Sequence, residues 1–431
     1  MKRVAFFLNN SNSINCTDIK KGNPGLGGTE YQIILIASLL AERKNGLEIV
    51  LLSPYKGKLP PVLYRQNVSS FYEASLYCVT NQVDYLIVNY TSADKNVIST
   101  FARLKYIIWC HNFVKFKDLD YFASERNILR VICVSNEQLD LYRDHKAFDK
   151  SDYIFNAIPC DDWKEVSYNN IPFKDRQNNV LYIGSLVECK GFCYLAKAWP
   201  RILASCKDAN LYVIGKGNLY NEGSILGSYG LADSGFEAAF MPYLTDSHGK
   251  ILPSVHFLGI MGKEKIEVMS KCKVGVPNPG GETETFGLTA VEMQMMGMEV
   301  TTIICPGYLD TVYQKENLYQ STDDLADRVV NLLKSRQPSA LQEKVWDFIY
   351  NRFSYEIILP QWERLLCECL DENSFLHHRG CCNPCFNYHS KRMKDRMRKA
   401  KSKIGGLSFF PAIERFYDWD KRIRLKIQQF I

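Results

Sequence analysis

Short apolar runs rich in β-branched residues alternate with longer amphipathic segments along this chain, almost to residue 350. Such alternation is typical of parallel βα units, in which each strand is followed by a helix that carries the chain back to the start of the next strand. The apolar runs lack a strict polar alternation, which indicates strands that are covered by helices on both faces. The pattern predicts an α/β fold with doubly wound parallel sheets.

This pattern occurs twice. In the first half, the runs that predict strands are Val4–Leu8, Glu48–Ser53, Tyr85–Asn89, Tyr106–Cys110, Val131–Ser135 and Tyr153–Asn156. In the second half, they are Val180–Gly184, Leu211–Gly215, Val255–Leu258, Val274–Pro277 and Val300–Ile304, with helices expected after Gly191, Lys263, Phe286 and Ser321. The polar segment 160–179 between the two sets has neither period, so we expect it to be the linker.

A chain of 431 residues is long enough for two or three domains. We therefore expect two Rossmann-like, doubly wound domains that face a cleft, over residues 1–160 and 175–351. A helix over 352–370 is expected to return to the first domain. Residues 371–431 would form a separate tail.

Composition excludes several classes of protein. With 46% hydrophobic and 23% charged residues, the chain is an ordinary globular protein and not a disordered or fibrous one. The apolar run 33–40 is much shorter than a membrane-spanning helix. The N-terminal segment has too few consecutive apolar residues to form the core of a signal peptide. We expect a cytoplasmic protein. Because the 15 cysteines are odd in number and lie mostly in apolar runs, we expect no disulfide framework.

The charge is concentrated at the C-terminal end. Residues 371–431 hold 14 lysines and arginines against 6 acidic residues, a net charge of +8, whereas the rest of the chain carries −2. The run 391–403 has eight basic residues and predicts attraction to an anionic membrane surface, with a peripheral position at the inner membrane face. The alternatives are a solvated helix or a flexible linker, and nucleic acid is an unlikely partner. Cys381, Cys382 and Cys385 lie near histidines, so they are either zinc ligands or ordinary thiols. Asp418-Trp-Asp420 lies in this tail and is interpreted as a solvated helix face, not as a metal site.

The stretch from Pro277 to Met293 carries the most chemical information. A strand is expected to end at Pro277, a glycine-rich loop follows, and a helix begins near Phe286. The unpaired backbone N–H groups at such a helix start form an anion site. Glu284 and Glu292 are eight positions apart, which places one carboxylate just before the helix and the other on the same face about two turns later. Taken by themselves, two glutamates at this spacing would ordinarily be interpreted as a helix cap, Glu284, and a solvated surface residue, Glu292.

The order of motifs along residues 1–370 resembles the family 4 retaining glycosyltransferases, which have the GT-B fold. Glu284 and Glu292 with Phe286-Gly287-Leu288 between them look like the signature of that family. The other matching segments are Asn23-Pro-Gly-Leu-Gly27-Gly28-Thr-Glu30, Trp109-Cys-His111-Asn112, Ile154-Phe-Asn156-Ala-Ile-Pro, Tyr182-Ile-Gly184-Ser185 to Lys190-Gly191, Val213-Ile-Gly215-Lys-Gly217 and Val255-His-Phe-Leu-Gly259.

The resemblance implies a role for each matching residue. Glu292 would accept hydrogen bonds from the ribose hydroxyls of a nucleotide sugar, and Glu284 would contact the transferred sugar. Lys190 would stabilise the leaving diphosphate, and His111 would support the sugar and the acceptor side. Residues of three glycine-containing segments would also hold the donor. They are Gly27, Gly28, Ser185, Phe286, Gly287, Leu288 and Thr289.

One departure weakens the positive charge at this site. Ser185 stands where the family usually has an arginine, and Lys216 and Lys263 are the basic residues considered as replacements. The segment after the signature helix is also altered, to Gly297-Met-Glu299-Val300. Neither change removes a predicted catalytic carboxylate.

The resemblance thus implies a glycosyltransferase of class EC 2.4 that moves a sugar from a nucleotide sugar to a hydroxyl of a saccharide or lipid-linked saccharide. A UDP-sugar is favoured and a GDP-sugar is the alternative donor. Retention of the anomeric configuration, no catalytic metal, no cofactor and a place in polysaccharide biosynthesis are expected. The competing hypotheses are a GT-B-fold epimerase or hydrolase of nucleotide sugars, and an inactive nucleotide-sugar-binding scaffold. The sequence leaves the base, the sugar, the acceptor, the linkage and the oligomeric state open.

Overall fold

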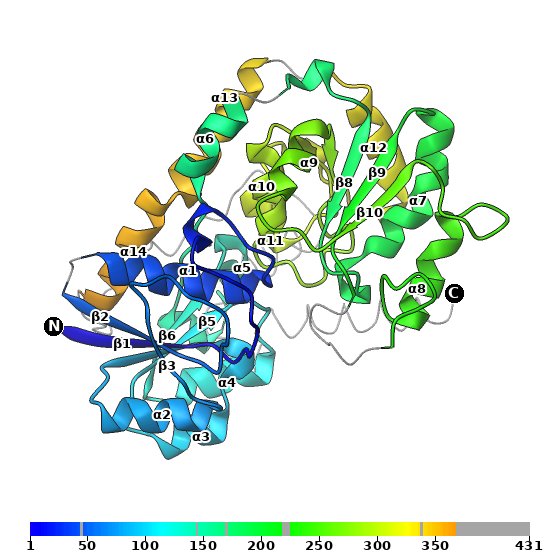
Figure 1. Cartoon of the computed structure of the whole chain (residues 1–431). Helices are drawn as coiled ribbons and strands as arrows, with labels where there is room; N and C mark the ends of the chain where they lie inside the picture. The colour runs from blue at the N-terminus through cyan, green and yellow to red at the C-terminus, as the bar shows by residue number, and fades with distance from the viewer. Residues whose placement is uncertain (44–45, 144, 169–170, 218–224, 337–338, 368–431) are drawn as a thin grey trace, which may run out of the picture.

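The computed structural model describes residues 1–43, 46–143, 145–168, 171–217, 225–336 and 339–367 (Figure 1). The hypotheses about the tail lie outside these residues. They concern zinc at Cys381, Cys382 and Cys385, the basic run 391–403 and the pair Asp418 and Asp420.

The first sheet has seven parallel strands in the order β3-β2-β1-β4-β5-β6-β7. Their bounds are β1 Lys2–Phe7, β2 Leu47–Leu52, β3 Tyr64–Gln66, β4 Tyr85–Asn89, β5 Tyr106–Cys110, β6 Ile128–Cys133 and β7 Ser151–Tyr153. The helices between them are α1 Gly28–Glu42, α2 Phe71–Thr80, α3 Lys95–Thr100, α4 Phe116–Ser124 and α5 Asn136–Asp140. The exposed edge strand β3 was not predicted, because three residues are too short for a periodic signal. The last strand ends at Tyr153, so the predicted strand 153–156 is wrong beyond its first residue.

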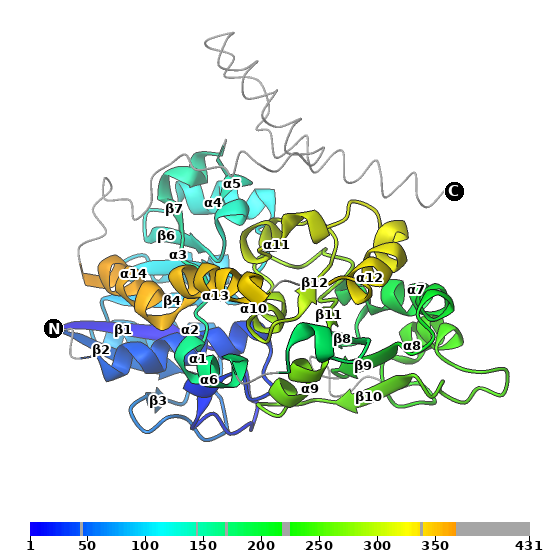
Figure 2. The same ribbon diagram turned by 90° about the horizontal axis from the view of Figure 1, so that it is seen from above.

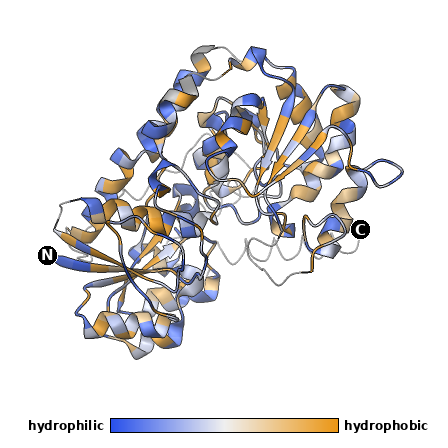
Figure 3. Cartoon of the chain, in the orientation of Figure 1, coloured by the Kyte–Doolittle hydropathy of each residue, from blue (hydrophilic) through white to orange (hydrophobic). Residues whose placement is uncertain are grey.

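Alternate residues of β1 enter two different apolar clusters. Val4 and Phe6 pack in a cluster with helix α1, whereas Ala5 and Phe7 pack in another cluster with α2. Both faces of the strand are therefore buried, as expected for a doubly wound sheet. Figure 3 shows the strands of both sheets as mainly apolar ribbons between helices with polar outer faces.

The second sheet has five parallel strands in the order β10-β9-β8-β11-β12. Their bounds are β8 Asn179–Ile183, β9 Asn210–Ile214, β10 Val255–Gly259, β11 Val274–Gly275 and β12 Glu299–Val300. The helices are α7 Phe192–Ser205, α8 Ser234–Phe240, α9 Lys265–Lys271, α10 Leu288–Met295, α11 Pro306–Thr311 and α12 Leu325–Leu333. Strand β11 is shorter than predicted because Pro277 has no N–H for a ladder and Asn278 turns the chain with a positive φ of 28°. Strand β12 also spans fewer residues than predicted.

The segment expected to be an irregular linker contains helix α6, Cys160–Tyr168. Its Trp163 is 1% exposed and donates a hydrogen bond from Nε1 to the carbonyl oxygen of Lys21 at 2.8 Å. One large buried side chain therefore anchors the crossover to the first domain, although the segment as a whole is polar.

Two helices carry the chain back from the second domain to the first, α13 Ser339–Phe353 and α14 Tyr355–Cys367. The break at Ser354 was not predicted. Trp362 of α14 packs against Phe6 and Trp109, with ring centroids 6.2 and 4.7 Å apart. Figures 1 and 2 both show α14 lying over the first sheet beside α1.

Within the described ranges, no helix is both long enough and apolar enough to cross a membrane. The described cysteines from Cys16 to Cys305 are free thiols.

Candidate active site

A cavity of about 510 Å³ lies between the two domains. The first-domain wall comes from the start of α1 and from the segments that follow β4, β5 and β7. The second-domain wall comes from the segments that follow β8, β9, β10 and β11, together with the first turns of α9 and α10. Because the strands of each sheet are parallel, their carboxyl ends meet at one edge, and the two edges face each other across this space.

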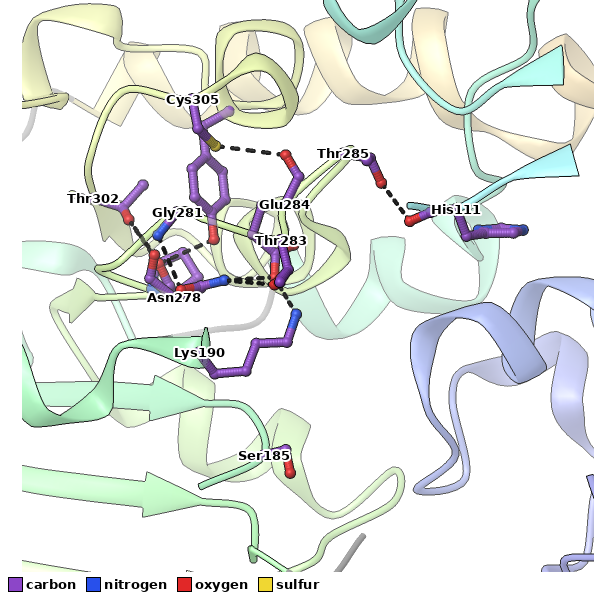
Figure 4. Close-up of polar contacts among 12 residues, drawn as sticks. His111, Ser185, Lys190, Asn278, Gly281, Thr283, Glu284, Thr285, Thr302 and Cys305 are labelled. Carbon is purple, nitrogen blue, oxygen red and sulfur yellow. Dashed lines mark hydrogen bonds and ion pairs between the residues drawn. The ribbon is translucent and has the colours of Figure 1, made fainter. Parts of the chain in front are cut away.

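Glu284 is the centre of a polar cluster on the second-domain wall (Figure 4). The ammonium group of Lys190 forms an ion pair with Glu284 Oε1, and Asn278 Nδ2 donates to the same oxygen at 2.9 Å. Asn278 in turn accepts a hydrogen bond from the backbone N–H of Gly281 at 3.0 Å, which fixes the loop between β11 and α10.

Burial and charge act in opposite directions on Glu284, whose side chain is only 14% exposed. Burial raises the pKa of this carboxyl group, but the Lys190 ammonium and the Asn278 amide more than offset it, so the pKa lies below its usual value. Glu284 is therefore an anion at neutral pH.

Lys190 reaches Glu284 because two backbone segments touch. Gly191 follows it with a φ of +67°, and a Cβ there would lie 2.3 Å from the backbone nitrogen of Gly280. Only glycine permits this approach of the loop after β8 to the loop after β11.

Helix α10 begins on the cavity wall. Gly287 stands before it with a φ of +85°, and Gly287, Leu288 and Thr289 all line the cavity. The first N–H groups of a helix lack partners within the helix, so this end can receive an anion.

Glu292, further along α10, forms a buried ion pair with Lys265 at the start of α9. Lys265 Nζ lies 2.7 Å from both carboxylate oxygens, and the two residues are 5% and 4% exposed. Lys265 Nζ also lies 5.9 Å from the centre of the Trp163 ring. Both residues line the cavity, so this pair forms a second charged position on the second-domain wall.

Ser185 contributes a hydroxyl group and no charge. It is 4% exposed and donates to the carbonyl oxygen of Lys216 at 3.1 Å. Neither Lys216 nor Lys263, the two replacements considered from the sequence, lines the cavity.

His111 directly follows β5 and lies on the opposite wall. Its carbonyl oxygen accepts a hydrogen bond from Thr285 Oγ1 at 2.7 Å, and its imidazole packs against Trp109 with ring centroids 4.4 Å apart. Figure 4 shows the imidazole pointing away from Lys190 and Glu284. Burial lowers the pKa of His111 to about 3, so the ring is neutral at pH 7.

Further contacts join the two domains. Ser135 Oγ donates to the carbonyl oxygen of Thr285 at 2.6 Å, and the backbone N–H of Glu137 donates to Asp310 Oδ2 at 2.8 Å. A Cβ added to Gly28 at the start of α1 would lie 3.1 Å from Leu288 Cδ1 at the start of α10. The two glycine-containing helix starts therefore meet across the cavity.

Comparison with solved structures identifies this two-domain arrangement. HepE from Anabaena, solved in complex with UDP and glucose, has a TM-score of 0.59 at 15% identity, covering 86% of this chain and 100% of that one. An α,α-trehalose-phosphate synthase (UDP-forming) from Burkholderia vietnamiensis has a TM-score of 0.56 at 11% identity, covering 86% and 97%. The lipopolysaccharide outer core galactosyltransferase WaaB has 0.54 at 13%, covering 84% and 98%. This chain has the GT-B fold.

Sequence comparison adds information about the second domain. Residues 177–335 match the model of a family described as glycosyl transferases group 1. No curated protein sequence matches the chain. The matched range holds Lys190, Glu284 and Glu292 together with Lys265.

The GT-B fold brings all of the predicted site residues to one cavity. The three residues predicted to be catalytic, Glu284, His111 and Lys190, line it, although His111 is on the wall opposite the other two. The predicted donor-binding residues line it as well: Gly27, Gly28, Ser185, Phe286, Gly287, Leu288, Thr289 and Glu292. Their roles stay predictions.

Sequence reasoning missed Lys265, Asn89 and the role of Asn278. Asn89 ends a correctly predicted strand, so the rule that strand ends meet at one edge could have identified it. Lys265 carried no such signal, because nothing in its local pattern separates it from the neighbouring exposed Lys263.

In the described ranges, no group of three or more histidine, cysteine, aspartate or glutamate side chains is placed to hold a metal ion.

Proposed function

We propose that this protein is a retaining glycosyltransferase that moves a sugar from a nucleoside diphosphate sugar to a hydroxyl of a saccharide or lipid-linked saccharide. The observation that carries the proposal is the second-domain wall, where Lys190 with Glu284, the start of α10, and Glu292 line one cavity. This wall belongs to the region that matches the glycosyl transferases group 1 model. A UDP-sugar is the favoured donor, because a structure of the same fold is described with UDP and glucose; a GDP-sugar is the alternative.

The charges on this wall suit the reaction. Breaking the bond between the anomeric carbon and the diphosphate oxygen builds negative charge on the diphosphate and positive charge on the sugar. An ammonium group has three N–H donors, so Lys190 can keep its bond to Glu284 and still donate to a phosphate oxygen. The N–H groups of Leu288 and Thr289 would add fixed positive ends of dipoles, and Glu284 would stabilise the sugar.

The proposed step balances without a protein nucleophile or a metal. The electron pair of the breaking bond leaves with the diphosphate. The acceptor oxygen forms the new bond to the anomeric carbon on the same face, and its proton passes to the departing phosphate oxygen. Retention follows from attack on the face that the diphosphate leaves. Glu292 would accept hydrogen bonds from the ribose hydroxyls, and its ion pair with Lys265 holds the carboxylate in place.

The test is sugar transfer by Lys190→Ala and Glu284→Gln variants. Donors would first be ranked by calorimetry with UDP-glucose, UDP-galactose, UDP-N-acetylglucosamine and GDP-mannose. We expect each variant to lose about 10²- to 10³-fold in kcat, the usual effect of removing one group that stabilises transition-state charge. Lys271→Ala is the matched control, because Lys271 forms an exposed ion pair with Glu267 in the same domain. Wild-type rates in folded variants would contradict the site assignment.

Other outcomes separate the competing functions. An epimerised or hydrolysed sugar in the absence of acceptor would indicate an epimerase or hydrolase. Binding of a nucleotide sugar without turnover would indicate an inactive nucleotide-sugar-binding scaffold, and absence of binding to every nucleotide sugar would indicate another function. Full activity in excess EDTA is expected for the metal-independent mechanism proposed here, and NMR of the product should show a retained anomeric configuration.

We propose further that the enzyme acts in the cytoplasm, at the inner face of a membrane. Support comes from the eight basic residues of the run 391–403, whose structure is not described. Sedimentation with vesicles of phosphatidylglycerol should recover the full chain, and vesicles of phosphatidylcholine should not. Loss of four of these basic residues should abolish sedimentation.

A further inference from the structure

The first-domain wall of the cavity carries a set of polar side chains to which the donor chemistry gives no role. Asn89 ends β4, Asn156 follows β7, and Glu30 lies in the first turn of α1. His111, from the segment after β5, lies on the same wall. Four separate elements therefore supply hydrogen-bonding groups to one side of the cavity.

Three of these side chains have buried polar atoms with unmet hydrogen-bonding capacity. Asn89 Oδ1, His111 Nε2 and Asn156 Oδ1 have no hydrogen-bond partner among the described residues, and the three residues are 8%, 8% and 3% exposed. Buried polar atoms almost always have a partner, so a cluster of exceptions on one cavity wall needs an explanation. A bound group with several hydroxyls would supply the partners once these side chains turn toward it.

The charge of this wall restricts what can bind there. None of the first-domain residues that line the cavity is a lysine or an arginine. His111 is neutral, and the ionisable carboxyl group on this wall belongs to Glu30, whose pKa is raised by burial. On the other wall, Lys190 and Lys265 are each already paired with a glutamate. A phosphate group on the acceptor would meet the Glu30 carboxylate, while the lysines among the described lining residues are engaged by Glu284, by Glu292 and, for Lys190, by the diphosphate of the donor.

We propose that the part of the acceptor that enters the cavity is an uncharged, unphosphorylated sugar or polyol, bound through its hydroxyls by Glu30, Asn89 and Asn156. A hydroxyl group both donates and accepts, which matches amide, imidazole and carboxyl partners on one wall. This inference rests on the proposed glycosyltransferase function, and it assigns acceptor residues and an acceptor class to the same site. The attacking hydroxyl forms the glycosidic bond and gives its proton to the departing phosphate, as above.

The experiment compares matched pairs of small acceptors with the donor that binds most tightly. The probes are glucose and glucose 6-phosphate, N-acetylglucosamine and its 6-phosphate, and glycerol and glycerol 3-phosphate. We expect kcat/KM to be at least tenfold higher for the neutral member of the pairs that react. Equal rates, or a preference for the phosphorylated member, would overturn the inference. Failure of all neutral probes, while the donor is bound and slowly hydrolysed, would also overturn it.

Variants identify the residues. Glu30→Gln should reduce the preference for neutral acceptors severalfold, because it removes the negative charge without changing the shape of the side chain. Asn89→Ala and Asn156→Ala should raise the acceptor KM about tenfold and leave the donor KM unchanged. Unchanged acceptor KM in both folded asparagine variants, together with an unchanged preference in Glu30→Gln, would refute the assignment.

Asn127→Ala is the matched control. Asn127 is a buried asparagine of the same domain whose Oδ1 also has no partner among the described residues, but it does not line the cavity. Its loss should lower stability without changing the acceptor KM. Calorimetric titration with UDP distinguishes a failure of the proposed function from a failure of this inference. Absence of any donor binding would contradict the proposed function itself, whereas normal donor binding with a preference for phosphorylated acceptors would contradict only this inference.

Discussion

Lys265 and Glu292 form a bidentate ion pair on the wall of the interdomain cavity, with the ammonium nitrogen 2.7 Å from both carboxylate oxygens. The side chains are 6% and 5% exposed, so both charges have lost most of their hydration. Such a pair contributes little net stability, but removing one partner leaves an uncompensated buried charge.

We therefore predict strong coupling between these two residues. Lys265→Met or Glu292→Gln alone should lower the free energy of unfolding by about 3 to 5 kcal/mol. The double variant should lose clearly less than the sum of the two. Urea denaturation of the three proteins and the wild type forms a double-mutant cycle. The exposed pair of Lys271 and Glu267 is the control, and its loss should change stability far less, because both charges stay in water. Additive losses at Lys265 and Glu292 would show that the pair does not form.

His111 should make stability depend on pH. Burial lowers its pKa from 6.5 to about 3, so below pH 6.5 the unfolded chain binds a proton that the folded chain does not. The stabilisation is complete above pH 6.5 and decreases by up to about 1.4 kcal/mol per pH unit as the pH falls towards 3. His111→Gln should reduce the slope between pH 6 and pH 5 by about that amount in urea denaturation. The exposed His248→Gln is the control for loss of an imidazole. Identical slopes for the wild type and His111→Gln would mean that this imidazole is protonated in the folded protein.

Gly287 should not tolerate a side chain. Its φ is +85°, and a Cβ would lie 2.5 Å from Cε1 of the buried Tyr308 ring. Left-handed backbone and overpacking together should cost Gly287→Ala about 2 to 4 kcal/mol. Donor affinity should fall as well, because the start of α10 moves.

Gly235→Ala provides the opposite case. Gly235 lies in helix α8, and a Cβ there would meet only Asp233 Oδ1 at an ordinary 3.5 Å. Alanine at a helical position should raise stability by about 0.5 to 1 kcal/mol. A Gly287→Ala variant as stable as Gly235→Ala would contradict the described geometry at the start of α10. Thermal unfolding followed by circular dichroism gives both values.

Thr285 should help to hold the domains together. Its hydroxyl donates to the carbonyl oxygen of His111 across the cavity, and its own carbonyl accepts from Ser135 Oγ. Thr285→Val keeps the shape but removes the donor, which should weaken the closed arrangement by about 1 to 3 kcal/mol. We expect a larger radius of gyration in small-angle X-ray scattering and a higher donor KM. Thr100→Val removes a hydroxyl bond within a single helix and serves as the control. Unchanged scattering and KM in Thr285→Val would show that this contact does not set the domain arrangement.

Some strands could be predicted from the sequence with their observed bounds, and others could not. The strands Tyr85–Asn89 and Tyr106–Cys110 were predicted with their observed bounds, because five buried residues in a row leave a clear apolar run. The short strand β3 was not predicted, and β11 and β12 were predicted to be longer than they are. Their two or three residues are defined by pairing with neighbours, and pairing leaves little local signal.

By itself, the sequence determined the repeated βα pattern, the glycine loop before α10 and the spacing of Glu284 and Glu292. These depend on local period and turn chemistry, which neighbouring residues specify. Tertiary structure alone decided that Lys265 pairs with Glu292 and that Lys190 reaches Glu284 through the contact of Gly191 with Gly280. These contacts join residues that are distant along the chain, so they depend on how two sheets and their helices pack, which no local pattern encodes.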